Sequence, residues 1–172
     1  MNRTAPSGNQ GQMQRMLGIE ISQHVGSRNE LAALFSEADD SESEIAGYRD
    51  LGEVLVARHV SAVVGHVQIV DTTEPGVAEI KSLAVYEEQR SHGIGTALVQ
   101  AALGRCRGQG VRVVRVATAA ASIDALKFYQ RQGFRIRQVI RDFYSAERGY
   151  RPLLLNGIPL LDEVILDIAF RP

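Results

Sequence analysis

The stretch EQRSHGIGTALVQAALGRCR, from Glu88 to Arg107, constrains the fold of this 172-residue chain more than any other segment. A valine-rich run precedes it, Gly93 and Gly95 open its first half, and apolar residues then recur with a period of about 3.6 residues. This order predicts a strand, a loop and the N-terminus of a helix. Because the first helical amides lack partners and glycines leave them uncovered, we expect an anion such as a pyrophosphate to bind at residues 90–96.

Two well-known nucleotide-binding loops are also glycine-rich, and the residues here argue against both. A dinucleotide-binding loop needs a further glycine where Leu98 stands, and no acidic residue ends the following strand at Ala117. A Walker loop needs a Gly-Lys-Ser/Thr sequence, which does not follow. Two interpretations remain: a pyrophosphate site with Arg90 and His92 as cationic groups at its rim, and a glycine turn that binds no ligand.

The other patterns alternate between strand and helix and predict a mixed α/β sheet with helices on both faces. Strand patterns cover residues 16–21, 53–60, 63–71, 78–85, 111–117, 134–145 and 163–169. Helix patterns cover residues 27–38, about 41–52, 95–107 and 122–132. The hairpin over residues 53–71 is antiparallel, whereas the strand–helix–strand units at 78–117 and 111–145 require crossovers between strands that are parallel or well separated.

Composition and charge exclude several classes of function. A formal net charge of -1 gives no electrostatic footprint for nucleic acid, and no apolar run approaches the roughly 20 residues that span a membrane. Cys106 is the only cysteine, so no internal disulfide can form; we expect a packed core thiol and a cytoplasmic location. Residues 1–15 are small and polar, so we expect a flexible tail there and a single domain over residues 16–172.

Three segments of the chain resemble the GNAT family of N-acetyltransferases. The loop sequence RSHGIG at residues 90–95 resembles the family's Q/R-x-x-G-x-G/A signature, and residues 78–85 resemble its fourth strand. Residues 122–134 resemble the family segment N-x-x-A-x-x-F-Y-x-x-x-G-F, with serine in place of the leading asparagine. The resemblance covers about residues 16–170. It implies a central, twisted, mostly antiparallel sheet of about seven strands with a parallel, splayed pair in the middle.

The resemblance also implies that acetyl-CoA is the cosubstrate, because the family's glycine loop holds the pyrophosphate of this molecule. A β-bulge in the strand before the loop is expected to free backbone groups for the thioester carbonyl and the pantetheine arm. Ser122 keeps a hydroxyl where relatives use an asparagine to hold the pantetheine, but its reach is shorter. The implied cofactor-binding residues are Leu83, Ala84, Val85, Arg90, Ser91, His92, Gly93, Ile94, Gly95, Thr96 and Ser122.

Two residues are implied as catalytic. Glu79 resembles the glutamate that some members use as the base for the acceptor amine, whose pKa is about 10. Tyr129 matches a tyrosine that lies beside the thioester sulfur in many relatives and can supply the proton of the departing thiolate. A solvent-facing glutamate and a tyrosine packed in the core are the alternatives that remain open for these positions.

The implied function is an acetyl-CoA-dependent N-acetyltransferase that acts on a primary amine of a small molecule or protein by direct attack in a ternary complex. A non-catalytic acetyl-CoA-binding sensor, an enzyme acting on a hydroxyl, and one using a longer acyl group are also consistent with the loop. Residues 38–52 and 144–162 are expected to select the acceptor. His59 and His66 lack a metal-ligand spacing, so no metal is expected. The family's use of its last strands in pairing makes a homodimer plausible.

Overall fold

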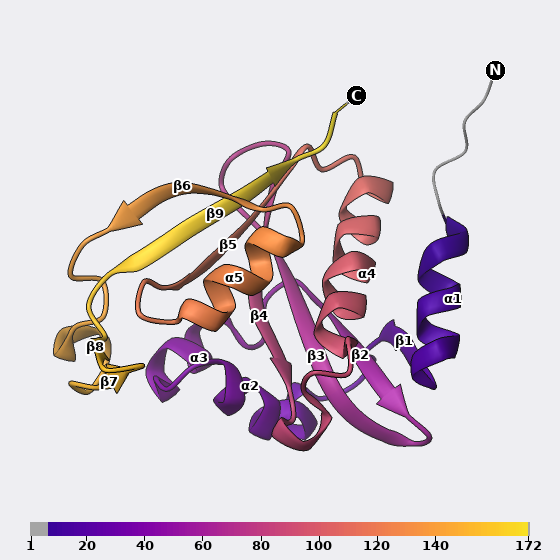
Figure 1. Cartoon of the computed structure of the whole chain (residues 1–172), viewed down its shortest axis with the longest axis horizontal. Helices are drawn as coiled ribbons and strands as arrows, with labels where there is room; N and C mark the ends of the chain where they lie inside the picture. Colours follow the sequence, from indigo (N-terminus) through magenta and orange to yellow (C-terminus); the bar gives the residue numbers. More distant parts are fainter. Residues whose placement is uncertain (1–6, 172) are drawn as a thin grey trace.

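A seven-stranded sheet with the order β1-β2-β3-β4-β5-β9-β6 forms the centre of the computed structural model, which describes residues 7–171 (Figure 1). Its strands are β1 (Ile19–Gln23), β2 (Glu53–His59), β3 (Ala62–Asp71), β4 (Val77–Val85), β5 (Val113–Ala119), β6 (Arg135–Ile140) and β9 (Glu163–Ala169). Neighbouring strands are antiparallel except β4 and β5, which are parallel in the middle of the sheet. The predicted mixed sheet with a central parallel pair is therefore confirmed.

Helices cover both faces of this sheet (Figure 1). They are α1 (Ser7–Leu17), α2 (Ala32–Ala38), α3 (Glu42–Tyr48), α4 (Ile94–Gly108) and α5 (Ile123–Arg131), with the 3₁₀ turns η1 (Arg28–Leu31), η2 (Glu87–Gln89) and η3 (Ala146–Arg148). The core under α4 and α5 contains Leu55 and Ala57 of β2, whereas the core under α2 and α3 contains Val54 and Val56. Because strand side chains alternate between faces, these two cores lie on opposite sides of the sheet. Among the described helices, none is long and apolar enough to cross a membrane.

The pairing register of β4 changes at Lys81. Ser82 pairs with Gln68 of β3, and Ile80 pairs with Ile69, so Lys81 is an extra residue that forms a β-bulge. β4 pairs with β5 as far as Ile80. Beyond the bulge, β4 continues beside β3 while β5 continues beside β9. The two central strands therefore separate at the bulge, which gives the splayed pair expected from the resemblance.

The N-terminal part differs from the expectation of a flexible tail. Residues 7–15 belong to α1, and residues 1–6 lie outside the described part of the chain. Met13 and Leu17, one helical turn apart, pack against the core beside α4. Three large apolar side chains, Met13, Met16 and Leu17, in a segment rich in glutamine and glycine are too weak a pattern to predict a helix from sequence. Because α1 occupies the chain up to Leu17, β1 begins at Ile19, later than predicted.

The segment between β6 and β9 also contains structure that the sequence pattern does not predict. β6 ends at Ile140, and the amide of Asp142 then donates to the carboxylate of Asp162 at 2.9 Å, which turns the chain out of the sheet. A small separate hairpin follows, made of β7 (Leu154–Leu155) and β8 (Ile158–Pro159). Strands of two residues are too short to show an alternating pattern, and the signal of this hairpin in the sequence is its turn, Asn156-Gly157, whose two positive φ angles are those of a type I′ turn.

Gly52, between α3 and β2, offers a test of this packing. Its φ is +56°, and a β-carbon there would overlap the carbonyl oxygen of Ile69. We expect Gly52→Ala to lower the free energy of unfolding by roughly 2–5 kcal/mol, because the alanine is strained and also displaces β3. Urea denaturation followed by circular dichroism measures the change.

Gly47→Ala is the matched control for this substitution. Gly47 lies within α3, with no neighbouring heavy atom within 4 Å of the position of an added β-carbon in the described structure. Alanine should therefore raise the free energy of unfolding by up to about 1 kcal/mol through its higher helix propensity. Equal effects of the two substitutions would contradict the close contact at Gly52.

Candidate functional site

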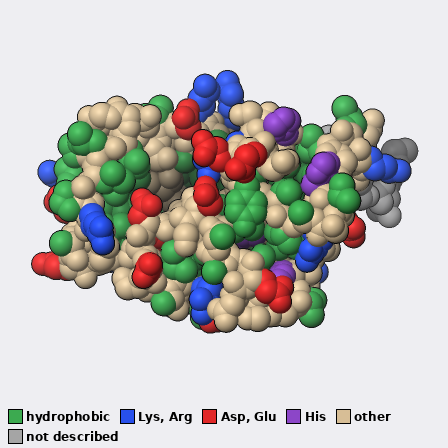
Figure 2. Space-filling model, turned by 90° about the horizontal axis from the view of Figure 1, so that it is seen from below, with side chains coloured by type: hydrophobic (Ala, Val, Ile, Leu, Met, Phe, Trp, Pro, Cys, Tyr) green, Lys and Arg blue, Asp and Glu red, His purple; other side chains and the backbone are tan. Residues whose placement is uncertain are grey.

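A cavity of about 220 Å³, here named the acidic pocket, lies beside the point where β4 and β5 separate. Six carboxylates line it: Glu37, Asp39, Asp40, Glu44, Glu79 and Glu163. Lys81 is the single lysine or arginine among its described lining residues. Figure 2 shows acidic side chains gathered beside a hollow near the middle of the face seen from below. The pocket therefore combines a concave shape with a strong excess of negative charge.

Glu79 and Lys81 form the wall that β4 contributes to the acidic pocket. They alternate with Ile80, which is buried in the core under α4. The Nζ atom of Lys81 lies 3.5 Å from Oε1 of Glu79 and 5.3 Å from the centre of the Tyr48 ring. Glu79, the predicted base, thus lines the pocket, but an ion pair with Lys81 engages its carboxylate.

Glu163, the first residue of β9, is absent from the residues that the sequence predicts for the site. Its side chain is buried, with 9% exposure, and within the described chain it forms no hydrogen bond or ion pair. Burial is the main cause that raises the pKa of its carboxyl to about 7, while nearby charges act in both directions. Its signal in the sequence is a pair of acidic residues, Asp162 and Glu163, before an apolar run, which is equally typical of an exposed strand end.

A second wall of the pocket is built by the end of α2 and by α3. Asp39, the C-cap residue of α2, accepts hydrogen bonds from the amide of Ser41 at 2.9 Å and the hydroxyl of Tyr48 at 3.5 Å. Burial is the main cause that raises the pKa of the Asp39 carboxyl. The hydroxyl oxygen of Ser41 accepts from the amide of Glu44 at 3.3 Å and caps α3, in agreement with the helix predicted from about residue 41. This cap fixes the start of α3, which presents Glu44 and Tyr48 to the pocket.

A third wall comes from the segment between β6 and β9. Tyr144 and Tyr150 line the pocket, and their rings meet edge to face with centres 4.8 Å apart. Burial is the main cause that raises the pKa of both phenols, so both stay neutral at physiological pH. These tyrosines belong to residues 144–162, one of the two segments expected to select the acceptor, and they give the pocket an aromatic side.

The glycine loop before α4 contains two residues with a left-handed backbone, Ser91 with φ +66° and Gly93 with φ +85°. The amide of Ala97 donates to the carbonyl of Gly93 at 3.0 Å, and the amides of the three residues between them have no acceptor within the helix. Ile94 buries its side chain in the core, which anchors the loop. Residues 90–96 therefore have the geometry of an anion-binding helix N-terminus, as the sequence predicts.

The side chains of Arg90 and His92 in the loop both contact other groups of the protein. Arg90 donates from Nε to the carbonyl of Val85 at 2.9 Å and from Nη2 to the carboxylate of Glu37 at 2.6 Å. The Nδ1 atom of His92 lies 3.4 Å from the carbonyl oxygen of Gln89. Because Glu37 offsets the charge of Arg90, the positive potential of the loop comes mainly from backbone amides and the helix dipole. Arg90 also ties the loop to α2, which borders the acidic pocket.

Alternate backbone groups of β4 face the gap between β4 and β5. The amide of Tyr86 donates to the carbonyl of Val64 on β3 at 3.0 Å. In an antiparallel pair, residues bonded to the neighbour alternate with residues whose amides and carbonyls point away from it. Leu83 and Val85 therefore direct their backbone groups away from β3 and towards the gap, whereas those of Ala84 are used in pairing with β3. The Val85 carbonyl already accepts from Arg90, so the groups left for a ligand are the amides of Leu83 and Val85 and the carbonyl of Leu83.

The helix α5 carries two predicted site residues at different places. Ser122 occupies the N-cap position and lines the acidic pocket, although within the described chain its side chain makes no capping hydrogen bond. Tyr129 is buried and packs edge-on against Phe128 and Phe134, with ring centres 5.1 and 5.7 Å apart from its own. Burial raises the pKa of the Tyr129 phenol. The structure therefore brings Ser122 to Glu79 in one pocket and places Tyr129 in the adjoining core.

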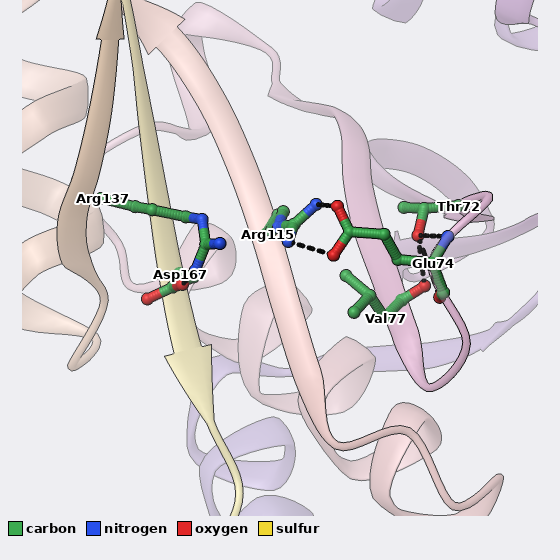
Figure 3. Close-up of polar contacts among 6 residues, drawn as sticks. All are labelled: Thr72, Glu74, Val77, Arg115, Arg137 and Asp167. Carbon is green, nitrogen blue, oxygen red and sulfur yellow. Dashed lines mark hydrogen bonds and ion pairs between the residues drawn. The ribbon is translucent and has the colours of Figure 1, made fainter.

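Ion pairs on the sheet surface hold the turn between β3 and β4 next to the pocket wall (Figure 3). Both terminal nitrogens of Arg115 donate to the carboxylate of Glu74 at 2.6 Å, and Arg137 pairs with Asp167 at 3.0 Å. Arg115 is also the register partner of Glu79 on β4. The pair of Arg115 with Glu74 holds the turn that leads into β4, the strand of Glu79, while Arg137 joins β6 to β9 at the surface.

Histidine and cysteine side chains lie apart from the acidic pocket. His66 is buried, with Nε2 2.8 Å from the hydroxyl of Ser82, and burial lowers its pKa to about 4, so it is neutral. His59 lies at the end of β2 beside Gly18. Cys106 is buried in the core under α4, as predicted. Among residues 7–171, no group of three or more His, Cys, Asp and Glu side chains is arranged to hold a metal ion.

Comparisons with known proteins agree with this geometry. The sequence model of the acetyltransferase (GNAT) family matches residues 22–134. The N-acetyltransferase YvbK of Bacillus subtilis is 32% identical over 150 residues, which cover 87% of this chain and 94% of the relative. A Bacillus subtilis acetyltransferase solved in complex with CoA is 29% identical with a TM-score of 0.81, covering 89% of this chain and 99% of that one. A GNAT family acetyltransferase from Elizabethkingia anophelis with acetyl-CoA bound is 25% identical with a TM-score of 0.83, at the same coverage of 89% and 99%.

Glu163 predicts a pH-dependent effect on stability. Its carboxyl has a pKa of about 7 in the folded protein, above its ordinary value of 4.5. The folded state therefore binds this proton more tightly than the unfolded chain, and stability from this group is lost as the pH rises from 4.5 through 7. We expect the free energy of unfolding of Glu163→Gln to be higher than that of the native protein by roughly 1–3 kcal/mol at about pH 8. This difference should become smaller as the pH falls towards 4.5. Urea denaturation at both pH values measures this difference, and a difference independent of pH would contradict the raised pKa.

Proposed function

The chain belongs to the acetyltransferase (GNAT) family, and we propose that it transfers the acetyl group of acetyl-CoA to a primary amine of a small molecule or protein by direct attack in a ternary complex. The observation that carries this proposal is the position of the gap between β4 and β5. The glycine loop follows the end of β4, and the acidic pocket lies where the two strands separate. An acyl group held along β4 therefore meets an acceptor held in the pocket, as efficient transfer requires.

Two related structures support acetyl-CoA as the cosubstrate, since one holds CoA and the other acetyl-CoA. In this chain we assign the diphosphate to the amides of residues 91–96. The thioester carbonyl is assigned to the backbone of Leu83 and Val85, which faces the gap. An amide directed at the developing oxyanion stabilises the transition state more than the ground state. Ser122, at the start of α5, is assigned to the pantetheine arm.

The acidic pocket supports a protonated amine as the acceptor. Six carboxylates and one lysine line it among the described residues, and this excess of negative charge attracts a cation. Tyr48, Tyr144 and Tyr150 add aromatic faces on which an ammonium group can rest. Because the pKa of an alkylamine is about 10, the acceptor must lose a proton before it attacks. Glu79 and Glu163 are the pocket carboxylates that stand on strands of the central sheet.

Tyr129 is assigned to the departing sulfur of CoA. The burial that raises the pKa of this phenol keeps it protonated and able to donate. A sulfur leaving in the same dry region also has a raised pKa, as burial does for the thiol of Cys106, to about 11. Desolvation thus raises the pKa of both the phenol and the thiol. The phenol can therefore still donate its proton to the thiolate.

An acetyl-CoA-binding sensor would need the glycine loop but no base and no acceptor pocket. The concave, aromatic and acidic cavity beside the gap therefore favours the enzyme. A cytoplasmic location and a homodimer stay predictions. The first follows from the single cysteine. The second is supported by β6, the outer strand of the sheet, which exposes Ile136 and Val139.

Gly93 tests the assignment of the diphosphate. Its φ is +85°, and a β-carbon there would meet the Leu17 side chain at 3.7 Å, an ordinary contact. Alanine disfavours this left-handed backbone and turns the amides that follow it away from the diphosphate. We expect the affinity for acetyl-CoA, measured by isothermal titration calorimetry, to fall at least about tenfold, the equivalent of one hydrogen bond to a charged group. Gly110→Ala is the control, because Gly110 lies beyond the other end of the same helix with a φ of +78°, and this variant should bind like the native protein. Equal affinities of the two variants would place the diphosphate elsewhere.

Tyr129→Phe tests the assignment of the proton donor. The substitution removes one oxygen and keeps the ring packing with Phe128 and Phe134, so we expect native affinity for acetyl-CoA. Turnover should fall on the order of 10²–10⁴-fold, the usual loss for a removed general acid. A thiol-release assay with a panel of primary amines measures turnover. Tyr86→Phe, away from the pocket lining, serves as the control. Native turnover of Tyr129→Phe would mean that this tyrosine only packs.

A further inference from the structure

We infer that Glu163 is the base that takes the proton from the acceptor ammonium, and that Glu79 instead holds Lys81 in the pocket wall. This inference rests on the proposed N-acetyltransferase function and identifies the catalytic carboxylate within it. It differs from the expectation drawn from the resemblance, in which Glu79 is the base.

Glu163 differs from the other carboxylates of the acidic pocket in its lack of an ion-pair or hydrogen-bond partner within the described chain. Three are ion-paired: Glu37 with Arg90 at 2.6 Å, Glu44 with Arg148 at 3.5 Å and Glu79 with Lys81 at 3.5 Å. Asp39 accepts a hydrogen bond from a backbone amide, and Asp40 is exposed. Glu163 is buried and, within the part of the chain that the structure describes, has neither a hydrogen bond nor an ion pair. A buried carboxylate without donors is costly, so its place in a cavity points to a ligand that supplies N–H groups.

The backbone of Glu163 stands where β5 has already left β4. Its register partner on β5 is Ala119, beyond Val116, where the pairing of β5 with β4 ends. Pairing with Ile140 of β6 holds the same residue from the other side. The carboxylate therefore borders the end of the gap to which we assign the thioester, and strands on both sides keep it in place. Such rigid support is what a base needs in order to reach one reacting nitrogen.

Charged groups of both signs act on Glu163 from the elements packed around it. These groups are Lys81 and Glu79 on β4, Glu44 on α3, Arg148 on η3 and the phenol of Tyr144 before η3. The two cations lower the pKa of Glu163 and the two carboxylates raise it, so their effects oppose one another. Burial therefore decides the outcome, a pKa of about 7, at which a carboxylate can take a proton and release it again near neutral pH.

The proposed step balances in protons and electron pairs. Ionised Glu163 takes one proton from the ammonium, and the freed lone pair of the nitrogen attacks the thioester carbonyl carbon. The carbon–sulfur bond then breaks, and its electron pair leaves with the sulfur, which receives the phenolic proton of Tyr129. The second proton of the nitrogen returns to the Tyr129 oxygen, and Glu163 releases its proton to water. The products are the N-acetylated amine and the CoA thiol.

The test measures kcat/KM by thiol release between about pH 5.5 and pH 9 with acetyl-CoA and three acceptors: putrescine, tyramine and lysine methyl ester. For the native protein we expect kcat/KM to rise with pH and to level off above an apparent pKa near 7. Glu163→Gln should lose on the order of 10²–10⁴-fold at neutral pH and should lack this titration, while binding acetyl-CoA with native affinity. Glu163→Asp should restore part of the rate together with the titration.

Two further variants make the comparison specific. Glu79→Gln should retain a titration, displaced to lower pH because the charge of Glu79 that raises the pKa of Glu163 is removed, and should change mainly KM, because the substitution frees Lys81 and leaves the base in place. Asp162→Asn, next to Glu163 but bonded to the amide of Asp142, should keep the native profile. A native profile in Glu163→Gln, or loss of the titration in Glu79→Gln alone, would overturn the inference while leaving the acetyltransferase function intact. Failure of the native protein both to bind acetyl-CoA and to release thiol with any acceptor would instead overturn the proposed function, and the inference with it.

Discussion

The separation of β4 from β5 at the bulge on Lys81 is the constraint on which the rest of the structure depends. One extra residue ends the ladder between the two parallel strands, and the backbone groups of Leu83 and the amide of Val85 then face a gap instead of a strand. Buried backbone amides and carbonyls are costly without partners. The gap is therefore best completed by an extended ligand that carries its own amides, which is the chemical nature of a pantetheine arm. The gap thus lies where a further strand would pair with β4 in a continuous sheet.

The residues of β4 before and after the bulge pack into different cores of the protein. Ala78 and Ile80, before the bulge, are buried in the core under α4, whereas Ala84, after it, is buried in the core under α2 and α3. Anchoring on both faces holds β4 rigidly even where it has lost β5 as a neighbour. The strand can therefore present the same edge to a ligand without moving, and the glycine loop that follows it is fixed relative to the pocket.

Positive and negative electrostatic potential lie at different ends of this gap, although the net charge of the chain is close to zero. The helix N-terminus at residues 91–96 offers positive potential to a diphosphate, while the acidic pocket offers negative potential to an ammonium group. Arg90 and Glu37 form an ion pair between these two regions. Under the proposed function, each substrate is attracted to its own end of the gap, and the acceptor end contains Glu163, whose pKa burial raises to about 7.

The sequence by itself determined the features whose causes are local. The 3.6-residue period of α4, the glycines before it, the cap at Ser41 and the β-branched strands all follow from neighbouring residues, and they were enough to predict the sheet and the anion-binding loop. Only the tertiary structure determined which side chains from distant segments lie close together. Glu163 acquires its burial from β5, β6 and the tyrosines of a distant segment, and α1 is held by contacts of two apolar side chains with the core beside α4. The pKa of a carboxylate and the pairing of Glu79 with Lys81 depend on desolvation and on distances across the fold, and no short pattern in a sequence encodes either.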